Sequence, residues 1–315
     1  MKSYLQKQIV NNTLAHAYLF SGPNKIGKFT LANLFSKSIL CKSKEKLPCE
    51  KCDCCLQINK NISSDYIIVD KEADKKNISI KQIRDLQQKL SLKSFETNHK
   101  IVIINNSEHL SEEASNALLK TLEEPYSKII FVMITNQIDT VMTTIKSRCQ
   151  ILKFNNLPNF KIQNWLISKN IDKKMANLIC GISNGRPGIA KDYLENDQLL
   201  SSHIEKSKKL LLLMQANTIS EKLSLITEYL NKSFTSHEII SLLDDWEVVF
   251  RDIILIKMKN RNISNINLMS TLKKISSIYG FDKIINLHNL FNKSKQLIIN
   301  SVNNKLVLEN LILNI

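Results

Sequence analysis

The stretch GPNKIGKFT, Gly22 to Thr30, constrains the fold most, because it nearly completes a phosphate-binding loop. Gly22, Gly27 and Lys28 satisfy the pattern G-x-x-x-x-G-K-[ST], but Phe29 stands where a hydroxyl should follow the lysine. The loop has its required context, with the apolar run AYLFSG before it and the helical pattern LANLFSKSIL after it. The stretch therefore predicts a strand–loop–helix unit whose backbone N–H groups and Lys28 face phosphates.

The region up to about residue 155 alternates short apolar runs with helical patterns such as ISIKQIRDLQQKLS and SEEASNALLKTLEE. This alternation predicts an α/β domain with a parallel sheet that helices cover on both faces. Buried strands are expected at Ala17–Gly22, Tyr66–Asp70, Ile101–Ile104, Ile129–Thr135 and Ile151–Phe154.

Strand patterns fade after Pro158, and the rest of the chain has helical spacing, including an apolar stripe of Leu243, Trp246, Phe250 and Ile253. We therefore predict three parts. Residues 1–157 form the α/β domain, with a cysteine module at 41–55; residues 158–202 form a small helical domain; and residues 203–315 form a helical C-terminal domain.

Four cysteines, Cys41, Cys49, Cys52 and Cys55, have the spacing C-x7-C-x2-C-x2-C. Short gaps let neighbouring thiolates turn onto one ion, and four thiolates make the closed tetrahedral site of structural zinc. Because such a site leaves no position for water, we assign it no catalysis. Cys54 is the spare thiol, and an iron–sulfur cluster and a chance cluster of reduced thiols are the alternatives.

The side chains that normally hold magnesium beside a phosphate loop are replaced in this chain. Phe29 cannot coordinate a metal, and Thr30 comes one position late. After the apolar run KIVII, where acids should stand, the chain has Asn105 and Asn106. We therefore expect no ATP hydrolysis, while nucleotide binding through Lys28 and an ordinary strand-to-helix turn both stay open.

Composition adds a constraint on partners. The formal net charge is +15, from 44 basic and 29 acidic residues, which favours polyanionic partners, with nucleic acid as the first candidate. Lysines spread over solvated faces would give the same total. No apolar run is long enough for a membrane span, and the polar start MKSYLQKQIV lacks a signal core, so we expect a cytoplasmic protein and no membrane partner.

Several motifs occur together and in order: HAYLFSGP, the four-cysteine insert, QIRDLQQKLSLKSFETNHKIVIINNSEHLSEEASNALLKTLEEP and TIKSRCQ. Together they resemble the bacterial clamp-loader subunits of DNA polymerase III, densely from His16 to about Phe154 and more weakly in SNGRPGIA and NKLVLENLIL. The resemblance implies an AAA+ module with a helical lid and a helical collar domain. It also implies a ring-like pentamer with gamma/tau and delta subunits that opens the sliding clamp and places it on primed DNA.

Two branches of this family compete. The gamma/tau branch is the ATPase motor and needs intact metal ligands, whereas the delta-prime branch commonly lacks hydrolysis. Phe29, Asn105 and Asn106 favour delta-prime, as does the expectation that a chain ending at residue 315 has no long tail of the tau kind. The resemblance thus implies a subunit of DNA polymerase III holoenzyme, a DNA-directed DNA polymerase, without catalysis of its own; an active gamma/tau-like ATPase is the alternative.

The resemblance assigns Arg148, within the motif SRC, the role of an arginine finger that reaches a neighbouring subunit's nucleotide. A guanidinium is always charged and offers a planar fork of donors. Thr135 and Asn136 fall at the first sensor position, and Arg186 resembles a second-sensor arginine, although a turn-stabilising role fits it equally. A third hypothesis is a binding module in which zinc and basic charge dock nucleic acid directly; tight DNA binding by the isolated subunit would favour it.

Overall fold

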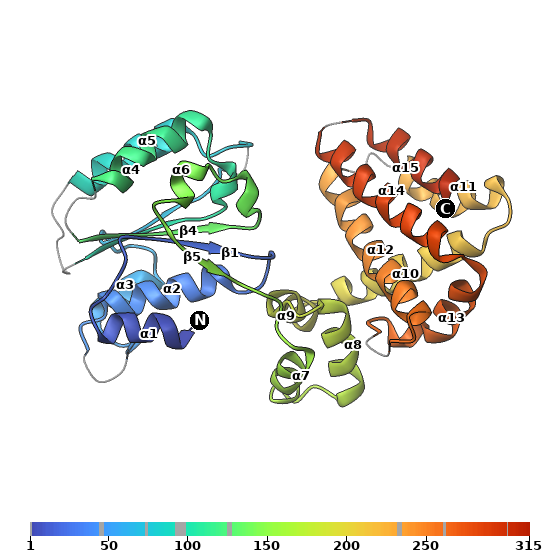
Figure 1. Cartoon of the computed structure of the whole chain (residues 1–315). Coiled ribbons are helices and arrows are strands. Elements are labelled where there is room, and N and C mark those ends of the chain that lie inside the picture. Colours follow the sequence, from blue (N-terminus) through green and yellow to red (C-terminus); the bar gives the residue numbers. More distant parts are fainter. Residues whose placement is uncertain are drawn as a thin grey trace. The chain divides into compact units, whose positions relative to one another are not determined.

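The chain folds as two units, Met1–Asn156 and Leu157–Ile315, each described by itself below (Figure 1). The computed structural model describes residues 2–43, 47–72, 75–91, 99–124, 128–231, 235–260, 263–300 and 302–315. Among these residues no helix is long and apolar enough to cross a membrane.

The first unit is built on a five-stranded sheet with the order β2-β3-β4-β1-β5, in which every neighbouring pair is parallel. Its strands are β1 (Ala17–Ser21), β2 (Tyr66–Val69), β3 (Lys100–Ile104), β4 (Ile129–Thr135) and β5 (Gln150–Lys153). Its helices are α1 (Lys2–Val10), α2 (Lys28–Leu40), α3 (Asp53–Asn59), α4 (Ile80–Ser91), α5 (Glu112–Glu123) and α6 (Thr143–Lys146), with short 3-10 turns η1 (Ser107–His109) and η2 (Ile138–Thr140). The predicted fold class is confirmed.

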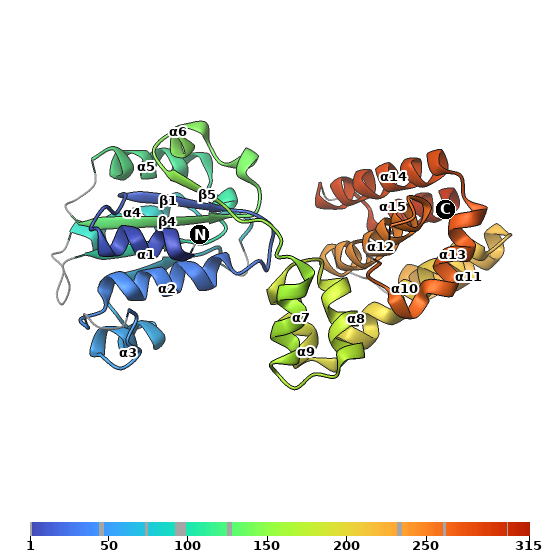
Figure 2. The ribbon, with the colours of Figure 1, turned by 60° about the horizontal axis from the view of Figure 1, so that its bottom comes forward.

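Alternate side chains of the strands point to opposite faces and make two hydrophobic cores. Leu19 of β1 belongs to the core shared with α4, α5 and α6, and Phe20 belongs to the core shared with α1, α2 and α3. Figures 1 and 2 show these two helical layers on either side of the sheet. Strands buried on both faces explain why β1, β3 and β4 are continuous apolar runs.

One expectation from the sequence differs from the structure. The strand expected to be buried at Ile151–Phe154 is β5, whose residues alternate between half-buried and exposed, with Ile151 38% exposed. The reason is position, since β5 pairs only with β1 and closes one side of the sheet. Helix α1 lies in the polar start of the chain, where no helix was predicted, and Leu5 is its one buried residue.

The parallel register brings the carboxyl ends of the central strands to one edge. Ser21 at the end of β1 pairs with Thr135 at the end of β4, and Ile104 at the end of β3 pairs with Met133 of β4. The loops that follow these strands therefore open side by side, at the edge where open α/β sheets bind ligands. The phosphate loop is one of these loops.

The second unit consists of helices with two separate cores. Its helices are α7 (Asn159–Ile167), α8 (Lys173–Ser183), α9 (Pro187–Glu195), α10 (Asp197–Gln215), α11 (Ile219–Asn231), α12 (Ser236–Lys257), α13 (Met269–Ile278), α14 (Phe281–Ile299) and α15 (Asn304–Asn314), with the turn η3 (Ile266–Leu268). A small core joins α7, α8, α9 and Leu200 of α10, and a larger core joins α10 to α15. The predicted stripe of α12 lies in the larger core, fully buried.

The three-part division stays a prediction. The two separate cores of the second unit support it. The boundary predicted at residues 202 and 203 falls inside α10, whose Leu200 packs with the small core and whose Leu210 packs with the larger one.

Candidate functional site

The phosphate loop has the backbone that its glycines predict. Gly22 has φ +154°, and a Cβ built on it would lie 2.3 Å from the carbonyl oxygen of Phe154, so a side chain cannot fit. Gly27 precedes the first residue of α2 in a left-handed conformation, with φ +96°. Both glycines are therefore required by the turn itself, whether or not a phosphate binds in it.

Lys28 begins α2, but its ammonium is turned into the loop and bonded to the protein. Its Nζ donates to the carbonyl oxygens of Gly22 at 2.6 Å and Pro23 at 2.7 Å, and to Oδ1 of Asn136 at 2.8 Å. The residue is only 5% exposed. The donors that a phosphate would use are thus occupied by oxygens of this chain.

Burial lowers the pKa of Lys28 from 10.5 to about 8, while the nearby Glu108 carboxylate acts in the opposite direction. Asn136 connects the two charges, because its Nδ2 donates to Glu108 Oε1 at 2.8 Å while its Oδ1 accepts from Lys28. The second oxygen of Glu108 is buried and has no hydrogen-bond partner among the described residues. The edge therefore carries its own counter-charge for the lysine.

The two asparagines that replace the expected acids are also engaged within the chain. Asn105 Nδ2 donates to Asp70 Oδ2 at 2.7 Å, and Asn106 Nδ2 donates to Asp70 Oδ1 at 3.1 Å. The sequence reasoning did not single out Asp70 as a site residue. The sequence nevertheless indicates Asp70, because it directly follows β2, just as Asn105 directly follows β3. The carboxyl ends of neighbouring parallel strands lie at the same edge of the sheet, so these two residues are expected to be close.

The remaining residues expected near a nucleotide do not form a metal site. Phe29 is 38% exposed, and Thr30 is also exposed on α2. Thr135 is fully buried, and its hydroxyl donates to the carbonyl oxygen of Gln137 and accepts from the Gln137 N–H, which caps the end of β4. Asn136 is thus the sensor-position residue that reaches the loop lysine.

Arg148 lies just after α6 with its guanidinium half-exposed. Its Nη2 donates to Oε1 of Glu123 at 2.6 Å, and its Nη1 donates to the carbonyl oxygen of Thr144 at 3.0 Å and to Ser147 Oγ at 3.3 Å. Glu123 is the last residue of α5 and was not identified from the sequence. Among the described residues, Arg148 makes no hydrogen bond or ion pair to the phosphate loop of its own chain, and its role as a finger stays a prediction.

Arg186 lies in the second unit as the residue before α9. Its Nε is buried and has no hydrogen-bond partner among the described residues. It lines a cavity of about 380 Å³ together with Arg251 and His288. Its assignment to a sensor or to a turn stays open.

The four predicted cysteines come together. The sulfurs of Cys41, Cys49, Cys52 and Cys55 all lie within 4.8 Å of one another, and Cys54 is not part of the group. Thiolates about 2.3 Å from a shared tetrahedral ion would be about 3.8 Å apart, close to the 4.0 Å between Cys41 Sγ and Cys52 Sγ. The donor set and its spacing therefore fit a zinc ion.

The surroundings of the cysteines act on their thiols unequally, because burial raises the pKa of Cys41 and of Cys55 whereas backbone N–H groups stabilise the thiolate of Cys49. N–H groups of Lys51 and Cys52 donate to the Cys49 sulfur and lower its pKa to about 6. The cluster is tied to the sheet domain by Lys37 of α2, whose Nζ lies 3.3 Å from Glu50 Oε2, an oxygen that also accepts from Asn59. The module thus has a fixed place at the end of α2.

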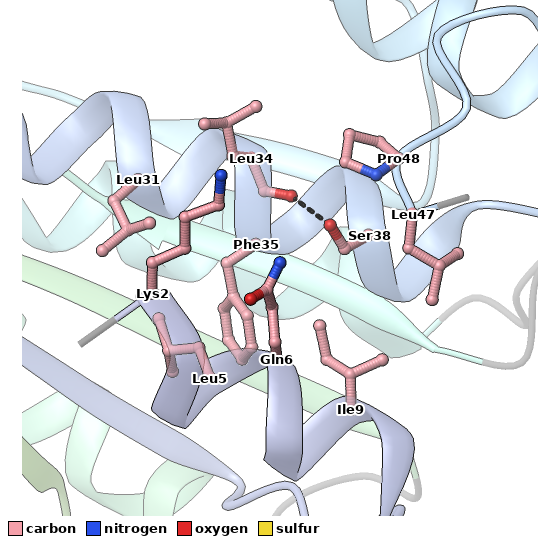
Figure 3. Close-up of a pocket in the computed structure, with 10 residues that line it drawn as sticks. All are labelled: Lys2, Leu5, Gln6, Ile9, Leu31, Leu34, Phe35, Ser38, Leu47 and Pro48. Atoms are coloured by element: carbon pink, nitrogen blue, oxygen red, sulfur yellow. Dashed lines mark hydrogen bonds between the residues drawn. The ribbon is translucent and has the colours of Figure 1, made fainter.

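A small apolar pocket of about 90 Å³ lies beside the module, away from the phosphate loop. Figure 3 shows side chains of α1 and α2 lining it together with Leu47 and Pro48. Ser38 at its wall already donates to the carbonyl oxygen of Leu34 at 2.8 Å. Lys2 and Gln6 of α1 are its other polar lining residues, and the rest of the described lining is apolar.

Comparison with known proteins gives consistent matches. Residues 1–158 match the model of the family described as DNA polymerase III, delta subunit. The chain is 34% identical over 204 residues to DNA polymerase III subunit delta' of Bacillus subtilis (strain 168), covering 65% of this chain and 61% of that protein. It is 33% identical over 213 residues to DNA polymerase III subunit gamma of Buchnera aphidicola subsp. Schizaphis graminum (strain Sg), covering 64% and 58%. The chain thus spans about three fifths of the length of these relatives.

A solved structure extends the likeness to the whole chain at the level of the fold. It is a DNA polymerase III gamma subunit-related protein from Thermotoga maritima, with a TM-score of 0.53, 19% identity, and coverage of 98% of this chain and 97% of that chain. A phosphate-loop sheet domain followed by helical regions is therefore a fold that this chain shares with that protein over nearly its whole length.

Proposed function

The chain belongs to the DNA polymerase III delta subunit family, and from this premise we propose that it is a delta-prime-like clamp-loader subunit that does not hydrolyse ATP. It would act in the cytoplasm, in a complex with gamma/tau and delta subunits, and help to place the sliding clamp on primed DNA. The delta' and gamma relatives support membership of such a complex. The net charge of +15 suits an assembly that encloses DNA through its phosphates.

One observation carries the non-hydrolysing role: the loop lysine and the two asparagines that replace the expected acids are all bonded inside the chain. Lys28 is held by three protein oxygens, and Asn105 and Asn106 both bond to Asp70. Amides supply neither the negative charge that holds magnesium nor a base for water. We infer a site that keeps the shape of a phosphate loop without its chemistry.

Arg148 gives a reason to retain such a subunit. Its half-exposed guanidinium can reach outside the chain, where it would stabilise charge on a neighbouring subunit's γ-phosphate. The subunit would then complete another active site while having none of its own.

Cys41, Cys49, Cys52 and Cys55 would hold a structural zinc ion. Zinc, when bound, supplies a cross-link with no open coordination position. The purified native protein is expected to contain one equivalent of zinc by elemental analysis, with loss on Cys52→Ser. A stably folded native protein without zinc would contradict this assignment.

The function is tested by ATP turnover, with and without DNA, for the isolated subunit and for its mixture with a gamma/tau-type motor. We expect no turnover alone and turnover in the mixture. Appreciable turnover by the isolated subunit that Lys28→Ala abolishes would refute the proposal.

A gamma/tau-like ATPase is the second candidate, and one observation favours it. Glu108 has a buried oxygen without a described partner, which a cation or water could satisfy. Turnover that depends on magnesium and is lost in Glu108→Gln would identify this candidate.

A further inference from the structure

We propose that Glu123 is a counter-ion that restrains Arg148 in the resting subunit and must release it before the guanidinium acts on a neighbour's nucleotide. The proposal rests on the arginine-finger function proposed above. It adds a named residue and a direction of regulation to that function.

The contact itself is short and directional. Oε1 of Glu123 accepts from Arg148 Nη2 at 2.6 Å, while Thr144 and Ser147 accept from Nη1. The guanidinium is therefore held at both of its terminal nitrogens, which are the groups that would form a fork on a phosphate. Binding a phosphate through Nη2 requires competition with the carboxylate.

The carboxylate occupies a position that would be unfavourable without a cation. Glu123 is the last residue of α5, where the helix dipole presents its negative end. Arg148 offsets this repulsion in the resting state. In turn, the carboxylate cancels much of the positive potential that a finger must bring to a developing negative charge.

The strength of the pair suits a restraint that a nucleotide can overcome. The side chains are 35% exposed for Arg148 and 49% exposed for Glu123. Pairs this open to water are weak, so removing the carboxylate should change the availability of the finger by about 1.5- to 5-fold. The several negative charges of a neighbour's triphosphate can displace one such carboxylate.

The experiment compares steady-state ATPase rates of reconstituted complexes in the absence of clamp and DNA. Complexes contain the wild-type subunit, Glu123→Gln, Arg148→Ala or the double variant. We expect Glu123→Gln to raise the rate about 1.5- to 5-fold, and the double variant to match Arg148→Ala. This dependence on Arg148 separates release of the finger from a general change in structure.

Glu124→Gln is the matched control. Glu124 is the next residue on the same exposed helix end, so the variant removes the same charge without removing the bond to Arg148. Its rate should equal the wild-type rate.

Each outcome decides one of the two proposals. If Arg148→Ala abolishes activity but Glu123→Gln leaves it unchanged or lowers it, the restraint is wrong and the finger stands. If Glu124→Gln raises the rate as much as Glu123→Gln, general charge is responsible and the restraint is wrong. If Arg148→Ala has no effect, the finger function fails, and the restraint fails with it.

Discussion

The first unit carries two cationic groups suited to phosphate chemistry, and they differ in what surrounds them. Lys28 is buried and bonded to three oxygens of its own chain. Arg148 is half-exposed, and its one ionic partner among the described residues is a half-exposed carboxylate. A buried cation with all its acceptors in place has little to gain from a ligand, whereas an exposed cation in a weak pair can exchange partners at small cost.

The comparison teaches where chemistry can remain after a site has lost its metal ligands. At the sheet edge, Asp70 accepts from both Asn105 and Asn106, the two amides that stand where acids are expected in a magnesium site. At the end of α6, the Thr144 carbonyl oxygen accepts from one terminal nitrogen of Arg148, while the other terminal nitrogen donates to the half-exposed carboxylate of Glu123. The same domain can therefore be inert toward its own nucleotide and active toward a neighbour's.

Arg148→Ala should have the largest effect and tests the active half of the comparison. In a reconstituted complex, hydrolysis at the adjacent motor site should fall by about 10³- to 10⁵-fold, because the transition-state charge loses its guanidinium. The rate is measured in single turnovers, with the other motor subunits inactivated. Arg148→Lys keeps the charge without the planar fork, so its hydrolysis rate should lie between the rates of the wild type and of Arg148→Ala. Unaltered single-turnover rates in an assembled Arg148→Ala complex would remove the distinction between the two cations.

Lys28→Met tests the inert half and should have the next largest effect. The variant leaves Asn136 Oδ1 and two backbone carbonyl oxygens without their donor, so the free energy of unfolding should fall by about 1–3 kcal/mol. Urea unfolding measures this free energy. The control is Lys25→Met, in the exposed part of the same loop, which should change the free energy of unfolding by less than about 0.5 kcal/mol.

The same measurement with ATP and magnesium sharpens the result. A ligand that binds only the folded state raises the unfolding free energy. We expect no increase for the wild type or for Lys28→Met. An increase confined to the wild type would mean that Lys28 still binds nucleotide.

The sequence predicted the elements of this edge better than it predicted their bonds. Continuous apolar runs identified β1, β3 and β4, because strands buried on both faces have no other pattern available. Gly27 was predictable because a left-handed turn before a helix requires glycine. The apolar run at β5 predicts a buried strand, which is wrong, because β5 lies at the edge of the sheet. The order of the strands decides which of them lies at an edge, and no single run of residues contains that order.

The missed contacts have different causes. Asp70 could have been found from its place after β2. Glu123 could not, because its bond to Arg148 joins residues 25 apart through the packing of α5 on α6, and no periodicity encodes that geometry. The orientation of Lys28 depends on Asn136, which lies 108 residues further along the chain.

The depressed pKa of Lys28 predicts how stability should respond to pH. Its pKa is about 8 in the folded chain and 10.5 as an ordinary lysine, so between these values the unfolded chain binds more protons. The unfolding free energy of the wild type should therefore rise relative to that of Lys28→Met by about 1 kcal/mol between pH 7 and pH 9. Parallel urea series for the two proteins measure the difference. A difference that is flat or falls over this range would mean that the loop holds Lys28 as an ordinary ammonium, exchangeable with a ligand.

Asn105→Asp should have the smallest effect and tests whether the edge can regain its chemistry. The new carboxylate would face Asp70 in place of the amide that donates to it at 2.7 Å. Because Asp70 is exposed, the loss should be only about 0.5 kcal/mol of unfolding free energy near pH 7, and it should vanish at acidic pH where the carboxylates are protonated.

The double variant Asp70→Asn with Asn105→Asp reverses the polarity of the pair and should recover most of this loss, since an amide again faces a carboxylate. Neither variant should gain ATP hydrolysis, because Lys28 remains bonded within the loop and Phe29 still offers no ligand. Magnesium-dependent ATP turnover by Asn105→Asp alone would show that a single carboxylate separates this sheet edge from a working site. The contrast between an inert sheet edge and a functional Arg148 would then be wrong.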